Sequence, residues 1–454
     1  MHPSIDQIVM QFKNDISRAF NPTAIVAMCR LIGHTWRDRQ LGPVETVQAF
    51  LLQVLHGNTA CTHVPRLVGK DFTAEAYAQA RRRLPLELFQ RLLKDVCSRL
   101  HGSVDTAATW FGHRVWTIDG SACSMPDTPE LQEAFGQPDA QSPGWGFPVA
   151  HLMTLFHAST GMLLRIAAAP MRTHDMARAH LMHGALAPND VVLADRGFCS
   201  FAHLAMLHQA GVHAVFRAHQ KQIVDFRKGR MHALPCPLFK RPRRFQGLPS
   251  SRWVQWLGRC DQIVEYFKPP NRPQWMAVEQ WNALPQSLLV RELRYDVVDR
   301  GSRTRSITLV TTLRDPVAYP AEALAALYAK RWQIETNLRH LKETLGMDVL
   351  HTKTVAGIHK ELTIFAIVYN LVRLVMVEAA NRQHVEPERI SFIDALRWLC
   401  CVTEDVTLRA IQIVPERPGR HEPRVRKRRP KNYRLMTKPR AELKKLLTGH
   451  AVAP

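Results

Sequence analysis

Features that would indicate an oxidising compartment or a structural metal are scarce in this chain. Its nine cysteines are odd in number and scattered, and none forms a C-x2-C pair. This pattern argues against a disulfide framework and against a zinc knuckle. The 22 histidines form no H-E-x-x-H or comparable ligand pattern, so we expect them to be surface or core residues.

Signals for export or for membrane insertion are also missing. The N-terminal MHPSIDQIVMQFKND lacks the basic and then apolar pattern of a signal peptide. The longest apolar run, residues 362–380, is interrupted by Asn370 and Arg373, so we expect a buried helix rather than a membrane span. These absences predict a protein without a membrane partner that stays in the cytoplasm, where DNA is.

Negative charge is scarce relative to positive charge. Sixty-one Lys and Arg residues against 39 Asp and Glu residues leave a net charge of +22. This excess indicates a polyanionic partner, and nucleic acid is the commonest one. At 454 residues the chain is long enough for two or three domains with substantial cores.

One predicted helix, over residues 320–346, places a carboxylate among cations. In YAKRWQIETNLRHLK, the side chains of Tyr328, Arg331, Glu335 and Lys342 follow one another at helical spacing. At about 100° per residue they fall within a stripe roughly 60° wide. On an isolated helix, a Glu and an Arg at this spacing more often form a solvated ion pair, so the helix alone does not establish a site.

Two aspartates far upstream supply the context for that helix. Asp119 in RVWTIDGSA and Asp195 in DVVLADRGF each end an apolar, strand-like run. Three carboxylates that converge from two strands and one helix suit a pair of divalent metals acting on phosphodiesters. Other aspartates near these positions sit in polar turns, and we interpret them as surface or capping residues: Asp127, Asp175 and Asp190.

The spacing Tyr-x2-Arg-x3-Glu-x6-Lys, preceded by Asp-Gly-Ser and by Asp-x-Gly-Phe, resembles the IS4-type DDE transposases of bacterial insertion sequences. The resemblance covers about residues 40–440 and matches Asp119, Asp195 and Glu335 to the three family carboxylates. It implies that Asp119 bridges two Mg2+ ions, with Asp195 and Glu335 on one ion each. Mn2+ is expected to substitute for Mg2+.

The resemblance also matches Tyr328, Arg331 and Lys342 to the family's signature helix. Because a carboxylate cluster repels the DNA backbone, we expect Arg331 and Lys342 to restore attraction and to fix the scissile phosphate. Tyr328 can donate a hydrogen bond to phosphate or stack on a base. Arg339 falls on the same stripe and is a further candidate.

The predicted fold class is α/β. Three strands, a helix, a strand, a helix and a strand form the element order of an RNase H-like (DDE) catalytic core. In that fold the first strand is central and the fourth lies beside it, so the resemblance implies that Asp119 and Asp195 are neighbours. We predict that the core occupies residues 109–218 and 306–405, separated by a mainly β insertion at 219–305.

Basic segments flank the predicted core at both ends. A helical N-terminal domain over residues 1–108 contains a helix that ends with Arg81, Arg82 and Arg83. Short helices around a Gly-containing turn suit a helix-turn-helix module that contacts DNA, and the alternative is a helical bundle with a solvated basic edge. The C-terminal tail, 406–454, should be flexible until it meets DNA. Its candidate DNA-binding residues are Arg426, Lys427, Arg428 and Arg429.

Tryptophans are the remaining candidates for DNA contact. Related transposases stack a flipped base on an aromatic residue of the insertion during hairpin formation, so the resemblance implies that one tryptophan there has this role. Each taken singly is more often a core residue. We interpret Trp332, beside Arg331, as a core residue. The candidates in the insertion are Trp253, Trp256, Trp275 and Trp281.

The resemblance implies a cut-and-paste transposase of the bacterial nucleoid. Its partners are then double-stranded DNA, as element ends and target, and a second copy of the chain in a synaptic homodimer. Two alternatives remain open at this point: an RNase H-like endonuclease that cuts without strand transfer, and a catalytically inactive DNA-binding regulator.

Overall fold

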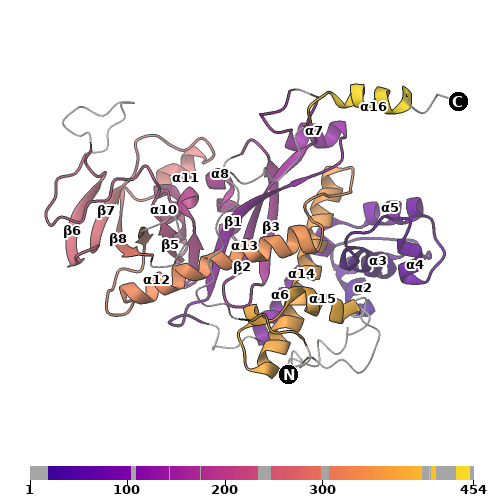
Figure 1. Ribbon diagram of the computed structural model, residues 1–454, viewed down its shortest axis with the longest axis horizontal. Helices are drawn as coiled ribbons and strands as arrows, with labels where there is room; N and C mark the ends of the chain where they lie inside the picture. The colour runs from indigo at the N-terminus through magenta and orange to yellow at the C-terminus, as the bar shows by residue number, and fades with distance from the viewer. Residues whose placement is uncertain are drawn as a thin grey trace.

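The computed structural model describes residues 19–103, 109–142, 144–173, 175–233, 247–297, 306–400, 408, 411–415 and 436–449. In Figure 1 a group of N-terminal helices lies at the right of the molecule, and the strands of residues 251–296 form the left-hand end of a large sheet. Four of the predicted DNA-binding residues lie outside the described residues: Arg426, Lys427, Arg428 and Arg429.

The described N-terminal region is helical, as predicted. The Thr73 hydroxyl accepts a hydrogen bond of 3.1 Å from the Ala76 N–H and caps one of the helices, which carries the three consecutive arginines at its end. Pro85 follows that helix and separates it from the next one. The helices are α2 (Pro22–Leu31), α3 (Pro43–Leu55), α4 (Val64–Val68), α5 (Ala74–Arg83) and α6 (Leu86–Ser103).

A single nine-stranded sheet forms the centre of the molecule, in the order β3-β2-β1-β4-β5-β9-β8-β7-β6. β1, β2 and β3 are antiparallel, whereas β4 and β5 run parallel to β1. The central and edge strands are β1 (Val115–Ser124), β2 (Val149–His157), β3 (Leu163–Pro170), β4 (Val191–Ala194), β5 (His213–Arg217), β6 (Ser251–Gly258), β7 (Asp261–Phe267), β8 (Ser287–Asp296) and β9 (Ser306–Thr311).

The strand order agrees with two predictions and refines a third. β1 is central and β4, the fourth strand, lies beside it. The strands predicted as an insertion do not form a separate sheet, because β9 pairs with β5 and continues the core sheet through β8, β7 and β6. The helix expected after β3 is broken into two short helices, α8 (Asp175–Arg178) and α9 (His180–His183).

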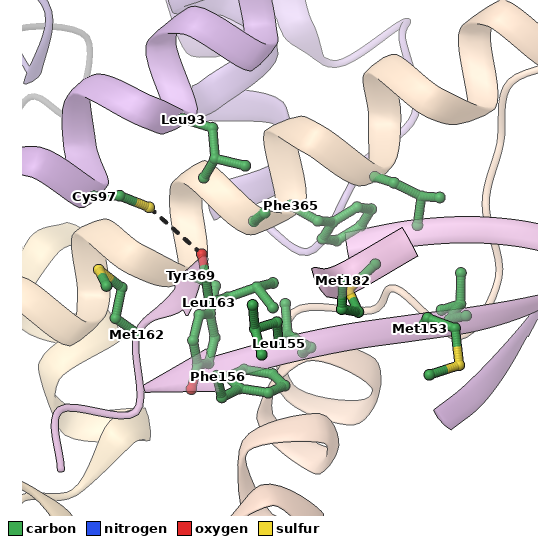
Figure 2. Packing of buried hydrophobic residues seen from close by; sticks show 14 of the residues in the cluster. Leu93, Cys97, Met153, Leu155, Phe156, Met162, Leu163, Met182, Phe365 and Tyr369 are labelled. Carbon is green, nitrogen blue, oxygen red and sulfur yellow. Dashed lines mark hydrogen bonds between the residues drawn. The ribbon is translucent and has the colours of Figure 1, made fainter. Parts of the chain in front are cut away.

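Side chains of the central strands alternate between two hydrophobic cores. Val191 and Leu193 belong to one core, which is covered by α12 (Ala321–Ala329). Val192 and Ala194 belong to the larger core, which also contains side chains of α6, α10 (Phe201–Gln209) and α14 (Val355–Gln383). Figure 2 shows this larger core where α6 and α14 pack against β2 and β3.

The long helix α14 is buried, as its apolar run predicted. Among the described helices it alone is long and apolar enough to cross a membrane, but 94% of that apolar stretch is buried inside the protein. The Tyr369 hydroxyl donates to the Gly161 carbonyl at 2.8 Å, and Asn370 bonds both backbone groups of Leu163. These bonds are typical of a core helix, because the buried polar side chains of Tyr369 and Asn370 both have protein partners.

Short elements complete the described chain. They lie at the edges of the sheet, in the connections and near the C-terminal end: α7 (Pro129–Phe135), η3 (Arg196–Phe198), α11 (Val278–Ala283), η7 (Pro387–Arg389), α15 (Phe392–Cys400) and α16 (Arg440–Gly449). In Figure 1 α16 lies beside α7, far along the chain from it.

Candidate active site at the strand ends

The register of two central strands brings the two predicted catalytic aspartates together. β1 and β4 are parallel with Ile118 opposite Ala194, so the next residues, Asp119 and Asp195, are neighbours. The adjacency implied by the resemblance therefore agrees with the observed pairing. The prediction that Asp119 ends its strand is wrong, because β2 pairs with β1 through Ser124 and keeps it extended.

The Asp119 carboxylate is held by a backbone group and a buried cation. Its Oδ1 accepts a hydrogen bond of 2.8 Å from the Gly120 N–H. Its Oδ2 lies 3.9 Å from Nη1 of Arg331, whose side chain is only 5% exposed. The Arg331 guanidinium is in turn 4.8 Å from the ring centre of Trp332 and 5.8 Å from that of Tyr328. These contacts fix both members of the pair.

Asp195 has a cationic neighbour that the sequence pattern did not indicate. Nη1 of Arg217 lies 3.8 Å from Oδ1 of Asp195. β5 pairs with β4 in parallel with Phe216 opposite Ala194, so Arg217, the last residue of β5, lies at the same level as Asp195. The available signal was a cation directly after the buried run HAVF, but only the strand order shows which residue lies beside it.

The signature helix passes from one hydrophobic core to the other at Arg331. Leu324 and Leu327 of α12 belong to the first core, and Ile334 and Leu338 belong to the second. Between them the chain forms the 3-10 turn η5 (Lys330–Trp332), then α13 (Gln333–Arg339) and the π-helical segment η6 (His340–Thr344). These irregular turns mean that one uniform stripe does not describe the helix.

Glu335 lies on α13, which contacts β1, and its side chain is half-buried. After the helix, a bridge between Ser124 and Val349 ties the chain back to the end of β1. Lys342 is half-buried in the π-helical segment near Cys123 and Asp348. Burial lowers the pKa of Lys342, and these two neighbours partly offset the effect.

Buried polar atoms without hydrogen bonds face this region. Tyr328 is 1% exposed, and neither its hydroxyl nor Nε of Arg331 has a hydrogen-bond partner among the described residues. Oδ1 of Asp195 also lacks one. Burial raises the pKa of Tyr328, against the opposing influence of Arg331, so its hydroxyl remains a donor at neutral pH. Such unsatisfied groups are typical of a site that binds a polar ligand.

The residues suit divalent metals in type, since carboxylate oxygens are the ligands that Mg2+ prefers. Oδ1 of Asp195, which accepts no hydrogen bond from the described residues, is available as a ligand. Within the described ranges, however, no three Asp, Glu, His or Cys side chains are arranged to hold one metal ion together.

Of the side chains near the site, Trp332 lies differently from its predicted position. Trp332 is 52% exposed, so the prediction that it is a core residue is wrong. It follows Arg331 at the turn where the helix changes cores, and it faces neither of them. Asp190 is 1% exposed and accepts a hydrogen bond of 2.8 Å from Arg114, so it is not a surface residue. Its Oδ2 also accepts a hydrogen bond of 2.8 Å from the Ala187 N–H, which agrees with the capping alternative of the prediction. Arg339 is exposed, as is Asp127, which was predicted to be.

The four tryptophans of the insertion lie in different surroundings. Trp281 is buried, and Trp275 is stacked between the rings of His180 and His203, at 5.2 and 5.0 Å between ring centres. Trp253 is half-buried. Trp256 is 42% exposed on the edge strand β6, with Nζ of Lys228 4.1 Å from its ring centre. Trp256 is therefore the accessible member of the set.

Comparison with known proteins identifies the family of this chain. A family profile described as "Transposase DDE domain" matches residues 110–371. The chain belongs to the DDE transposase family. The matched range includes Asp119, Asp195, Glu335 and the whole signature helix.

The relatives of this DDE transposase include the transposase InsG for insertion sequence element IS4 of Escherichia coli K12. The two are 25% identical over 326 residues, which is 70% of this chain and 65% of that relative's length. The predicted resemblance to the IS4 family is thus confirmed.

Two solved structures show more distant likeness. A piggyBac transposase synaptic complex with hairpin DNA aligns with 87% of this chain and 76% of that chain at 9% identity and a TM-score of 0.39. A Mos1 transposase paired-end complex with a left transposon end aligns with 40% of this chain and 60% of that chain at 13% identity and a TM-score of 0.15.

Proposed function

We propose that this DDE transposase binds the ends of its insertion sequence as double-stranded DNA, cuts them and transfers the cut strands to target DNA. The observation that carries the proposal is the pairing of β1 with β4, which makes Asp119 and Asp195 neighbours at the place where Arg331 and Arg217 lie. We further propose that Glu335, on the adjacent α13, is the third catalytic carboxylate.

Cleavage and transfer are in-line displacements at phosphorus. The oxygen of water or of a 3′-hydroxyl forms the new P–O bond while the bond to the leaving oxygen breaks. Asp119 would hold both of two Mg2+ or Mn2+ ions, with Asp195 and Glu335 on one each. When bound, these ions supply activation of the attacking oxygen and stabilisation of the leaving one.

The cations and the tyrosine would position the scissile phosphate. Arg331 presents a planar guanidinium that can bond two phosphate oxygens, and Lys342 can act as a point charge. The Tyr328 hydroxyl, which has no partner among the described residues, is a donor for the same group. Arg217 would orient Asp195 and limit repulsion between the carboxylates and the DNA backbone. Arg339 is a further DNA contact.

The proposed domains keep the predicted limits. An RNase H-like core comprises residues 109–218 and 306–405, with the mainly β insertion at 219–305 between its parts. The helical region 1–108 and the tail 406–454 would add DNA contacts, and the exposed Trp256 would be the stacking platform if a hairpin forms. Two copies would hold two DNA ends in a synaptic homodimer in the bacterial cytoplasm, at the nucleoid.

Cleavage of a DNA fragment that carries the element's own ends tests the proposal. Wild type, Glu335→Ala and the exposed-site control Asp127→Asn are compared with Mg2+ or Mn2+, and binding is measured separately. We expect metal-dependent cutting by wild type and the control, and binding without cutting by Glu335→Ala. Cutting without joining to added target DNA would favour an endonuclease, and binding without cutting by wild type would favour a regulator.

A further inference from the structure

The N-terminal helices contain a basic groove that the proposed catalytic chemistry does not use. It has a volume of about 590 Å³ and lies between the loop that joins α2 to α3 and the end of α5. The loop contributes Trp36, Arg37 and Arg39, and α5 contributes Arg83. No Asp or Glu residue is among those that line it.

The three arginines of the groove are open to solvent and available to a ligand. Arg37, Arg39 and Arg83 are all exposed, and none forms an ion pair with a carboxylate in the part of the chain that the structure describes. The carboxylate at the edge of the groove, that of Glu45 beside Gly42, already has a cation, because Nζ of Lys70 lies 4.0 Å from it. Asp38 lies between Arg37 and Arg39 in the same loop, but it is exposed, does not line the groove and forms no ion pair with a described residue, so three arginines against this one carboxylate leave the loop and the end of α5 net positive.

An aromatic pair lies beside these cations. The rings of His34 and Trp36 are stacked, with 5.9 Å between their centres and 20° between their planes. Trp36 remains 37% exposed although it is large and apolar. Burial, together with the Lys360 cation, lowers the pKa of His34, so the pair is neutral at physiological pH and presents a flat surface rather than a charge.

The consecutive arginines of α5 divide between two pockets, because Arg81 and Arg82 line one of them and Arg83 lines the other. Nη1 of Arg81 donates to Gln53 at 3.0 Å, and its guanidinium lies over the rings of Phe50 and Tyr77. Arg82 lines a second, smaller pocket of about 330 Å³. Arg83 is the member that lines the groove with Arg37 and Arg39. The predicted DNA-binding trio is therefore not one surface.

We infer that this groove binds the phosphodiester backbone of duplex DNA, with Arg37, Arg39 and Arg83 on phosphate oxygens and Trp36 against an adjoining sugar. Guanidinium groups suit phosphate because they can donate two parallel hydrogen bonds. An exposed aromatic ring beside them adds apolar contact with the sugar. The inference rests on the proposed function, in which DNA is the partner, and adds Trp36, Arg37 and Arg39 to the previously predicted Arg83.

The salt dependence of DNA binding tests the groove. The full chain binds a fluorescein-labelled duplex of mixed sequence in EDTA, and anisotropy is followed over a range of KCl concentrations. The triple variant Arg37→Ala, Arg39→Ala, Arg83→Ala should bind at least about tenfold more weakly. The slope of log affinity against log salt should become shallower by about 0.9 for each phosphate that the variant no longer neutralises.

A matched triple variant separates local contact from net charge. It removes three surface arginines that lie elsewhere in the fold: Arg91→Ala, Arg172→Ala and Arg314→Ala. We expect this control to keep the wild-type slope. An equal loss in both triple variants would overturn the inference, because binding would then depend on net charge alone.

Trp36→Leu supplies a second and different readout. Because it removes no charge, affinity should fall about threefold to tenfold at every salt concentration with the slope unchanged. Should the triple variant fail to fold, as judged by circular dichroism, the single loop variant Arg39→Glu replaces it, and its slope should become shallower by about 0.9 for the one phosphate contact that it loses. If wild type does not bind duplex DNA, the proposed function fails. If wild type binds and the groove variants bind equally well, only the inference fails.

Discussion

Arginines at the strand ends and arginines of the N-terminal groove carry the same charge in opposite surroundings. Arg331 and Arg217 lie within 4 Å of the Asp119 and Asp195 carboxylates, and Arg331 is buried. The groove arginines, Arg37, Arg39 and Arg83, are exposed and without carboxylate partners among the described residues. A buried pair orients its members, whereas an open cation recruits a polyanion. We therefore expect substitutions at the strand ends to lower the cleavage rate without weakening DNA binding, and substitutions in the groove to weaken DNA binding.

A polar connection joins the two regions through α14. Nζ of Lys360, near the start of α14, donates to the backbone carbonyls of Arg81 at 3.3 Å and Arg82 at 2.9 Å. The side chain of Asn58 donates to Glu361 of the same helix at 2.8 Å. These bonds anchor the end of α5, and with it one wall of the groove, to the helix that fills the catalytic core.

The largest expected effect comes from the paired region, by which we mean Asp119 and Asp195 with their neighbours Arg331 and Arg217. Asp119→Asn keeps the shape of the side chain and removes the charge that Arg331 faces. We expect the initial rate of DNA cleavage to fall by roughly a thousandfold or more, since metal-assisted stabilisation amounts to several kcal/mol. Affinity for the same DNA, measured by anisotropy, should stay within about threefold of wild type. A variant that still cuts at a tenth of the wild-type rate would contradict the assignment.

Substitution of Arg331 tests whether the paired region can lose its buried cation while the affinity for DNA stays unchanged. Arg331→Ala should reduce cleavage by about a hundredfold to a thousandfold, by analogy with removal of one transition-state donor. Arg331→Lys keeps the charge but not the two-pronged geometry, and it should lie between Ala and wild type. The rate and the dissociation constant are measured on one substrate. Equal losses in both quantities would remove the distinction between the two regions.

The buried His203 on α10 shows how burial changes a pKa where no carboxylate partner offsets it. Burial lowers the pKa of His203 to about 4, from an ordinary 6.5. As pH falls between these values, the unfolded chain takes up a proton at His203 that the folded chain does not. The free energy of unfolding should therefore fall by roughly 3 kcal/mol over this window.

Urea unfolding of wild type and His203→Phe between pH 7 and pH 4 measures this contribution. In His203→Phe the free energy of unfolding should fall less between pH 7 and pH 4 than in wild type. The exposed-site control His208→Phe should keep the wild-type pH dependence. Identical pH profiles for all three proteins would show that His203 does not titrate as its burial requires.

The smallest expected effects separate two neighbours on α5. Arg81→Ala removes the bond to Gln53 and the contacts with Phe50 and Tyr77, and it should lower the free energy of unfolding by about 1–2 kcal/mol. Its effect on DNA affinity should be slight. Arg83→Ala should leave stability within about 0.5 kcal/mol and make the salt slope shallower by about 0.9. If Arg81→Ala changed the salt slope and Arg83→Ala lowered the stability, the assignment of Arg83 rather than Arg81 to the DNA-binding groove would be wrong.

Much of the catalytic region could be predicted from local pattern. The apolar runs before Asp119 and Asp195 are short enough to indicate strands, and the spacing from Tyr328 to Lys342 indicates a helix. What local pattern could not show was the irregular geometry of that helix. It changes cores at Arg331, which exposes Trp332, and its π-helical segment places Lys342 near Cys123.

The sequence by itself determined the chemical identity of the site and the order of its elements, because residue type, periodicity and spacing are local properties. Only the tertiary structure decided which side chains meet. It placed Arg217 beside Asp195, turned Arg81 inward and Arg83 into the groove, and joined the insertion strands to the core sheet. Contacts between segments far apart along the chain depend on strand order and on the packing of helices against the sheet, neither of which a local pattern records.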